Sequence, residues 1–378
     1  MAQKEAHMKK KNGPDLNVPR RTFGKTGVEV SKLCLGGGSF GGNDNQSLLD
    51  EALTLGVDCW EIISSTGNIY GEYFEKHPGI REKVFLSGKV YSTDTAVMQM
   101  QLDKMLNENK TSFLDFLALH PVDDIKVLNH DIRKWAGKVK KEKKIRFFGF
   151  CTHKNMESCL SDASKLGWID GIQTFYNYRM QSIKSMEDAL QKCCEKGIGI
   201  FAVKSMGLSV QKKNESEDLF SKQKIISSLK NCSVSFEQLK LRAIWQNFNV
   251  TSICSLMPTS AILHSNVSAA MDEHPLFSEA VKLLQAHANN TGEYFCRRCG
   301  ACETTNDGKI PILGIMELLM YARGYGKSDW AAQRFAQIPD EIQNKIAISD
   351  YSGAEKICPQ KMPIAKLMKE ACLEFDSG

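Results

Sequence analysis

Short apolar runs alternate with longer amphipathic stretches along most of the chain. Runs rich in β-branched and aromatic residues predict eight strands, at 30–36, 57–62, 84–90, 113–120, 145–153, 171–177, 198–205 and 250–256. Between most of them, apolar residues three and four positions apart predict helices, at 47–56, 96–108, 156–167, 185–197 and 236–247. Several of these stretches end at a glycine, the usual residue for a left-handed helix end. The pattern therefore predicts strands paired in parallel through right-handed crossovers.

The number of strand–helix units favours one architecture of the α/β class. Eight units between residues 30 and 256 fit a (β/α)₈ TIM barrel. An open, doubly wound sheet is the alternative, but we interpret the glycine run at 36–42 as a loop and not as a dinucleotide-binding turn. The first expectation is therefore a closed barrel.

Composition and charge exclude several classes of protein. A chain of 378 residues, 42% hydrophobic and 25% charged, is ordinary for a soluble globular protein with one large domain, or one large and one small. The net charge of +5 is modest, and the basic residues are spread along predicted helix faces with no interleaved aromatic residues, so we expect no nucleic-acid partner. No apolar run approaches the ~18 residues of a membrane span, so we expect no membrane partner.

The N-terminus and the cysteines point to a reducing compartment. Residues 1–20 carry basic side chains without the apolar core of a secretory signal, and we expect a flexible leader. Thirteen cysteines without such a signal indicate thiols that serve as core residues or metal ligands. A cytoplasmic location is the expectation.

Polar side chains stand at the carboxyl ends of six successive predicted strands. In a barrel of this class the active site is built at that end, so these groups should converge on one mouth. They are Glu61, Lys89, His120, His153, Asn177 and Lys204. Cys151 also lies near this end, either as a packing residue or as part of the site.

An ordered set of segments resembles the aldo/keto reductases. They are the stretch at 21–42, "LSGK" and "LALHPVDD" on the third and fourth strands, and "KKIRFFGFCTHKNM", "GIQTFYN" and "GIGIFAVKSMG" further along. The resemblance covers about Arg21 to Ala270 and implies hydride transfer from NADPH to a carbonyl. The family uses an Asp, a Tyr five positions later, a Lys and a His; the Lys lowers the pKa of the Tyr, which donates the proton.

Two of these four positions match and two depart. Lys89 and His120 match the family's Lys and His. Glu61 takes the place of the Asp, and Thr66, a far poorer proton donor, stands five residues beyond it. Tyr70 either begins the next helix or reaches back to the mouth. The candidate catalytic residues are Lys89, His120, Glu61, Tyr70 and His153.

The resemblance also implies a cofactor site with some residues missing. Gln173 matches the residue that holds the nicotinamide carboxamide, and Asn266 matches the one that contacts adenine. Asn177 and Lys204 complete the candidate cofactor-binding set. The basic residues that bind the 2′-phosphate are absent from 255–270, so NADPH is an expectation with weak support.

A cysteine motif lies beyond the barrel pattern. Cys296, Cys299 and Cys302 form a C-x₂-C-x₂-C run, and Cys358 is followed by a proline. The spacing resembles a two-cluster ferredoxin extension reduced to one cluster, which implies a [4Fe–4S] cluster on these four thiolates. Zinc is the alternative, although structural zinc sites usually pair two C-x₂-C knuckles. Helices are predicted at 312–326 and 363–375.

These features define the expected organisation and function. We expect a leader at 1–20, a barrel at 21–288 and a small α-helical iron–sulfur domain at 289–378. The principal hypothesis is an aldo/keto reductase-like iron–sulfur oxidoreductase that acts on a small carbonyl or hydroxyl substrate, with an electron-transfer partner. The alternatives are a barrel enzyme that performs acid–base chemistry without NADPH, or a non-catalytic electron-transfer protein.

Overall fold

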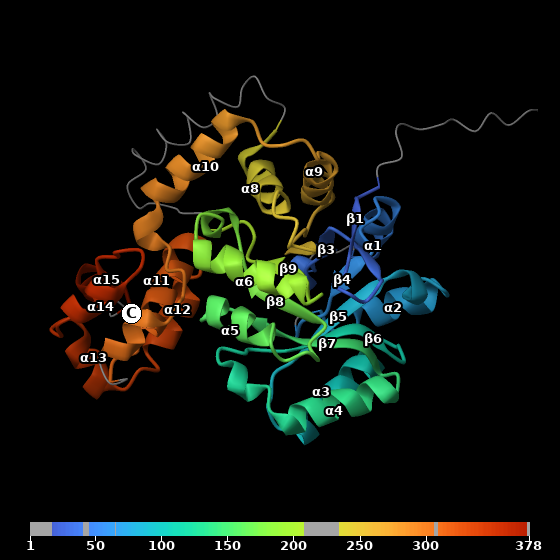
Figure 1. Cartoon of the computed structure of the whole chain (residues 1–378), viewed down its shortest axis with the longest axis horizontal. Helices are drawn as coiled ribbons and strands as arrows, with labels where there is room; N and C mark the ends of the chain where they lie inside the picture. The colour runs from blue at the N-terminus through green and yellow to red at the C-terminus, as the bar shows by residue number, and fades with distance from the viewer. Residues whose placement is uncertain (1–16, 41–44, 65, 208–233, 306–308, 376–378) are drawn as a thin grey trace, which may run out of the picture.

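The core of the protein is a closed barrel of eight parallel strands (Figure 1). The computed structural model describes residues 17–40, 45–64, 66–207, 234–305 and 309–375. The strands follow one another around the barrel in chain order, and the last pairs with the first. They are β3 (Leu33–Leu35), β4 (Cys59–Glu61), β5 (Phe85–Val90), β6 (Leu114–Leu119), β7 (Ile145–Thr152), β8 (Gly171–Phe175), β9 (Gly199–Val203) and β10 (Ser252–Ser255). All eight predicted strands, and with them the predicted barrel, are confirmed.

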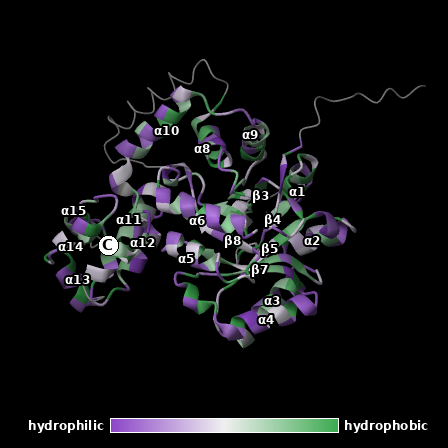
Figure 2. Cartoon of the chain, viewed as in Figure 1, coloured by the Kyte–Doolittle hydropathy of each residue, from purple (hydrophilic) through white to green (hydrophobic). Residues whose placement is uncertain are grey.

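Helices surround the barrel and bury their apolar sides against it. Figure 2 shows hydrophilic residues along the outer helix surfaces and hydrophobic residues toward the strands. Because the strands are covered from outside by helices and filled from inside by side chains, almost every strand residue is buried. The helices are α1 (Asn45–Thr54), α2 (Ile69–Lys76), α3 (Thr95–Glu108), α4 (His130–Lys141), α5 (Met156–Ala163), α6 (Lys184–Glu195), α8 (Phe236–Trp245) and α9 (Ser260–Met271). The five predicted helices of this region are confirmed.

An N-terminal hairpin closes the end of the barrel opposite the mouth. It consists of the antiparallel strands β1 (Arg20–Thr22) and β2 (Glu29–Ser31). Phe23, in the turn, is fully buried and lies 5.3 Å from the ring of Phe85 and 5.4 Å from that of Phe116. The hydrophobic pattern did not predict this hairpin, because its strands are three residues long.

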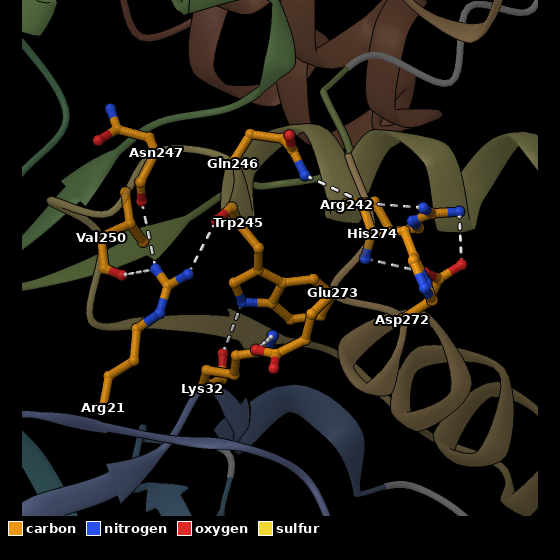
Figure 3. A network of polar contacts seen from close by, with 10 residues as sticks. All are labelled: Arg21, Lys32, Arg242, Trp245, Gln246, Asn247, Val250, Asp272, Glu273 and His274. Carbon is orange, nitrogen blue, oxygen red and sulfur yellow. Dashed lines mark hydrogen bonds and ion pairs between the residues drawn. The ribbon is translucent and has the colours of Figure 1, made fainter. Parts of the chain in front are cut away.

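A polar network fastens the hairpin to the seam between the last and first strands (Figure 3). Arg21 donates hydrogen bonds to the carbonyl oxygens of Trp245 at 2.8 Å and Val250 at 2.5 Å. Trp245 Nε1 in turn donates to the Lys32 carbonyl at 2.8 Å, and the buried Lys32 ammonium pairs with Glu273 at 2.8 Å. The network therefore joins α8 and the segment after α9 to the start of the barrel.

The predicted leader lies mostly outside the described residues, which begin at 17. Val18 is only 3% exposed, and its N–H donates to the Leu55 carbonyl at 3.0 Å. Packed structure thus begins before Arg20, the last residue of the predicted leader.

The C-terminal part is a separate helical cluster beside α5 and α6 (Figure 1). A long helix, α10 (Ser278–Asn290), leads to it from the barrel. Its own apolar core is centred on α11, and the predicted helices at 312–326 and 363–375 are confirmed as α11 and α15. The cluster comprises α11 (Ile312–Tyr325), α12 (Ser328–Phe335), α13 (Asp340–Ile346), α14 (Ser352–Ile357) and α15 (Ile364–Phe375).

None of the helices in the described part of the chain is both long enough and apolar enough to span a membrane.

Candidate active site

A buried carboxylate at the end of β4 has all of its hydrogen-bonding positions filled. Glu61 Oε1 accepts from Lys89 Nζ at 2.5 Å and from Gln173 Nε2 at 3.1 Å. Its Oε2 accepts from Cys254 Sγ at 3.2 Å and from the Gly37 N–H at 3.4 Å. A carboxylate has about four acceptor positions, so the free capacity of Glu61 is used up. Glu61 therefore serves to hold Lys89 in place.

The ion pair fixes both charges. Burial alone would raise the pKa of Glu61, but the Lys89 ammonium and the hydrogen bonds from Cys254 and Gly37 hold that pKa below its ordinary value. Burial would likewise lower the pKa of Lys89, but the charge of Glu61 raises it above the ordinary lysine value. At neutral pH the site thus contains a carboxylate and an ammonium. The ammonium has three N–H donors, and one of them is used by Glu61.

Two histidines from neighbouring strand ends face each other beside this pair. The rings of His120 and His153 are 5.1 Å apart, and Cys151 Sγ lies 3.5 Å from His153 Nε2. Burial and then the Lys89 charge lower the pKa of His120 to about 4. Burial and then the charge of Arg298 lower the pKa of His153 well below the ordinary value. Both imidazoles are neutral at pH 7, and His120 Nδ1 is buried without a partner among the described residues.

The same three side chains form a small group of potential metal ligands. Ligand atoms of His120, Cys151 and His153 lie within 4.8 Å of one another. The positive charges of Lys89, Lys204 and Arg298 all act on His153. A divalent cation would meet repulsion from these groups, so the local charge disfavours a metal ion at this position.

The loop after β4 gives Thr66 and Tyr70 structural contacts. Thr66 Oγ1 donates to the Gly37 carbonyl at 3.1 Å and accepts from the Ile63 N–H at 3.0 Å. Tyr70 lies in α2, fully buried, stacked on Trp60 at 5.1 Å, with its hydroxyl donating to the Glu61 carbonyl at 3.2 Å. Of its two expected positions, Tyr70 thus takes the one at the start of the next helix, where it packs in the core.

The predicted cofactor residues lie on the expected elements but already have partners. Gln173, on β8, uses its amide nitrogen for Glu61, while its Oε1 is buried and has no partner in the described structure. Asn266, on α9, donates to Ser255 Oγ at 3.1 Å. Asn177 accepts from the Arg179 N–H at 3.1 Å and donates to the Lys204 carbonyl at 3.5 Å. Gln173 Oε1 is therefore a buried acceptor that a ligand could use.

Lys204, at the end of β9, faces the C-terminal helices. Its backbone is in the left-handed region, with φ +58°. Its ammonium lies 5.2 Å from the ring centre of Tyr321 and 5.4 Å from that of Tyr325, both on α11. The last predicted strand end thus contributes a buried cation where barrel and helical cluster meet.

The four cysteines of the motif come together in the helical cluster. The thiols of Cys299 and Cys358 act on the pKa of both Cys296 and Cys302, which burial raises to about 12 in each case. Gln360 joins the segment of Cys358 to the segment of the C-x₂-C-x₂-C run. Its Oε1 accepts from the Arg297 N–H at 2.8 Å, and its Nε2 donates to the Phe295 carbonyl at 2.9 Å. Cys358, 56 residues after Cys302 in the sequence, is thereby held against the C-x₂-C-x₂-C run.

The four thiols lie close enough for their charges to act on one another, and both a [4Fe–4S] cluster and zinc take four thiolates. The Arg298 N–H also donates to Cys296 Sγ at 3.4 Å, a type of hydrogen bond that tunes iron–sulfur clusters.

The cysteine run is docked directly on the barrel mouth. The Asn155 N–H, two residues beyond His153, donates to the Arg298 carbonyl at 2.9 Å, and Arg297 pairs with Glu157 at 3.2 Å. The Arg298 side chain is 4% exposed, pairs with Glu317 at 2.7 Å and lies 6.0 Å from the ring centre of Phe175 at the end of β8. Arg298 thus lies both in the cysteine run and at the barrel mouth.

Several residues of this site were not predicted. Cys254 and Gly37 bind Glu61 from β10 and from the loop after β3, contacts that depend on barrel closure. Tyr91, just after β5, has its ring 5.5 Å from His120 and is 47% exposed. Its position two residues after Lys89 was a usable signal, because alternate residues of a strand point the same way.

The fold and the site define a class of protein: a TIM-barrel protein whose mouth carries a lysine–carboxylate pair and a neutral histidine. A sequence model of the aldo/keto reductase family matches residues 32–293. The chain belongs to the aldo/keto reductase family.

Comparisons with individual proteins give one partial relative in sequence and solved structures of similar fold. An uncharacterised 11.2 kDa protein from the crtE 3′ region of Pseudescherichia vulneris is 37% identical over 101 residues, 22% of this chain and 97% of that protein. The holo form of the aldo-keto reductase AKR11C1 from Bacillus halodurans superposes with a TM-score of 0.57 at 17% identity, over 71% of this chain and 96% of that one. Its apo form gives 0.56 at 18% identity over the same shares. At this identity the two structures show a common fold.

Proposed function

We propose that the protein is an iron–sulfur oxidoreductase of the aldo/keto reductase type. It interconverts a small carbonyl compound and its alcohol at the barrel mouth, and a [4Fe–4S] cluster on Cys296, Cys299, Cys302 and Cys358 passes electrons to or from this site. The observation that carries the proposal is the docking of the cysteine run on the mouth through the 2.9 Å hydrogen bond from Asn155 to Arg298. This contact gives the thiols a short path to the residues that would bind the substrate.

The residues present fit both groups. The four thiols lie near one another, Gln360 joins the segment of Cys358 to the segment of Cys296, and Cys296 accepts a main-chain hydrogen bond. For a nicotinamide, Gln173 Oε1 is a buried acceptor suited to the carboxamide N–H groups. A nicotinamide supplies or accepts two electrons as a hydride, and a cluster moves one electron at a time.

The chain's own residues would bind and polarise the carbonyl. Lys89, kept charged by Glu61, and the neutral His120 donate hydrogen bonds to the carbonyl oxygen, where negative charge develops during reduction. The family's tyrosine is missing from its usual position, and we assign the proton transfer to Tyr91. Burial raises the pKa of Tyr91, and the charge of Lys89 opposes that rise.

Acid–base chemistry without a nicotinamide has less support. Glu61 is a poor base for it, because its four acceptor positions are occupied by Lys89, Gln173, Cys254 and Gly37. The base would then have to be His120 or His153, whose pKa values burial lowers. If the protein transferred electrons and catalysed no reaction in the barrel, the buried Glu61–Lys89 pair would have no catalytic role.

The test is anaerobic purification followed by analysis of iron and sulfide and by binding of NADPH and NADH, followed through nicotinamide fluorescence. We expect four irons per chain, from the cubane stoichiometry, and nicotinamide binding that is weakened in Gln173→Ala. The matched control is Gln191→Ala, on α6, where the exposed side chain bonds Glu195. Zinc in place of iron, or an iron-loaded protein that binds no nicotinamide, would overturn the proposal.

A further inference from the structure

The junction between the barrel mouth and α11 contains buried hydrogen-bond donors without acceptors. Arg298 uses Nη2 for Glu317, but its Nε and Nη1 are buried and have no partner among the described residues. The Tyr325 hydroxyl is in the same condition. Arginine remains protonated at every relevant pH, so its N–H groups remain hydrogen-bond donors. Because these groups are buried, water does not supply the acceptors. Unpaired buried donors of this kind call for a ligand.

Lys204 adds a second cation to the same junction. Its ammonium lies over the rings of Tyr321 and Tyr325, and in the described part of the chain no carboxylate pairs with it. Burial, then the charges of Arg298 and Lys89, lower the pKa of Lys204, while Glu61 and Glu317 raise it. These groups are therefore close enough to interact.

Lys204 is the cation at the junction that has no carboxylate partner among the described residues. Lys89 pairs with Glu61, and Arg298 pairs with Glu317. The neighbouring histidines are neutral at pH 7 because burial lowers their pKa values. An anionic ligand would give Lys204 a counter-charge and would supply acceptors to the unpaired donors of Arg298.

The surrounding groups indicate an organic anion. Phe175 lies 6.0 Å from the Arg298 guanidinium and 6.4 Å from the ring of His153, and the Tyr321 and Tyr325 rings cover Lys204. Aromatic walls with a few convergent charged groups are typical of small-molecule sites.

The geometry points to a carboxylate-binding site on Arg298 and Lys204, so that the compound handled at the barrel mouth is a carbonyl or hydroxyl acid. This inference rests on the proposed function for the reaction, but the binding site stands on its own contacts. It also gives Arg298 a second function beside its place in the cysteine run: it joins the acid group of the substrate to the segment that carries the cluster ligands.

Calorimetry on the anaerobically purified protein tests the site with benzoate, its neutral analogue benzamide, and inorganic phosphate, without nicotinamide. Benzoate should bind, and Lys204→Met should weaken its binding by about 10- to 150-fold, the range for one charge-assisted hydrogen bond. The matched control is Lys184→Met, which removes the same charge from an exposed position beside Asp188 and should leave binding unchanged. Arg298→Lys should weaken binding too, with iron content measured to detect damage to the cluster.

The possible results are distinct. Equal binding of benzamide and benzoate, tighter binding of phosphate, or equal benzoate affinities in Lys204→Met and Lys184→Met would each overturn the carboxylate site. Benzoate binding that depends on Lys204, in a protein that oxidises no nicotinamide, would uphold the site and contradict the proposed function. Turnover of neutral carbonyl compounds without benzoate binding would do the reverse.

Discussion

Lys89 and Glu61, on the adjacent strands β5 and β4, form a buried ion pair with 2.5 Å between Nζ and Oε1. The Glu61 carboxylate also accepts hydrogen bonds from three further donors, which come from Gln173, Cys254 and Gly37. The pair therefore keeps a charged lysine ammonium at the barrel mouth.

Removing the charge of Glu61 should damage both stability and activity. In Glu61→Gln the Lys89 ammonium stays buried without a counter-charge, and breaking such a pair costs about 3–5 kcal/mol of unfolding free energy. Turnover should fall by about 10²-fold or more, as for the loss of an acid–base or positioning group. Urea unfolding and steady-state rates measure the two effects. Glu75→Gln, which breaks the exposed pair with Lys110, should change stability by less than about 1 kcal/mol; equal losses in the two variants would contradict the role of Glu61.

The two tyrosines near the mouth should differ in their effects. Tyr91→Phe removes the hydroxyl that we assign to proton transfer and should lower turnover with little effect on stability, because the residue is 47% exposed. Tyr70→Phe removes a buried hydrogen bond to the Glu61 carbonyl and should cost about 1 kcal/mol of stability while turnover is retained. Thermal unfolding and steady-state turnover rates, measured on both variants, distinguish the role of Tyr91 from that of Tyr70. Loss of turnover in Tyr70→Phe alone would restore Tyr70 as the proton donor.

Acid should destabilise the protein partly through His120. The pKa of His120 is lowered to about 4 in the folded state, below the ~6.5 of an unfolded chain. The folded state therefore binds fewer protons, so this contribution to stability is complete above about pH 6.5 and is lost as the pH falls toward 4. Urea unfolding at pH 7 and pH 5 should show a larger loss in the wild type than in His120→Gln. Identical losses would show that His120 titrates normally.

The cluster ligands should be separable from the other cysteine of the same domain. Cys358→Ser should lower the iron and sulfide content, because it removes one of the four proposed ligands. Cys372→Ser, a change of the half-buried thiol on α15, should leave the iron content unchanged. Full iron loading in Cys358→Ser would remove Cys358 from the ligand set.

Two glycines distinguish the barrel interior from its surface. A side chain at Gly149 would place its Cβ 1.8 Å from the Gly171 carbonyl oxygen on the adjacent strand, so Gly149→Ala should destabilise by at least about 1–3 kcal/mol. Gly137, inside α4, has open space around its Cα, and Gly137→Ala should stabilise by about 0.5–1 kcal/mol. Chemical denaturation of the two single variants measures the contrast. A neutral Gly149→Ala would contradict the close approach of β7 and β8.

Much of the barrel was predictable because its strands are short runs of mostly apolar residues, and several of them end at or next to a polar residue. Glu61, Lys89, His120 and His153 were found as strand ends, and parallel pairing alone required them to meet. The N-terminal hairpin was not predicted, because strands of three residues are too short to show a hydrophobic period. Its role depends on Phe23, whose ring contacts aromatic rings from four strands.

The residues that decide the chemistry were harder to predict. Two of the four acceptor positions of Glu61 are filled by Gly37 and Cys254. These two residues come from opposite ends of the barrel sequence and meet only when β10 pairs with β3. Arg298 could not be predicted as a site residue, because its contacts with Glu317 and Phe175 form only where the helical cluster packs against the barrel. Such contacts have no local signal in the sequence.

The most direct test of the central claim is an anaerobic titration of the oxidised, iron-loaded protein with NADPH, with a small carbonyl acid present and absent. The absorption of the cluster and of the nicotinamide is followed in the same sample, and Lys89→Met is measured in parallel. We expect NADPH to be oxidised by the wild type, with loss of cluster absorption or formation of the alcohol, and no such change in Lys89→Met. NADPH that remains intact beside a fully loaded cluster would contradict the account.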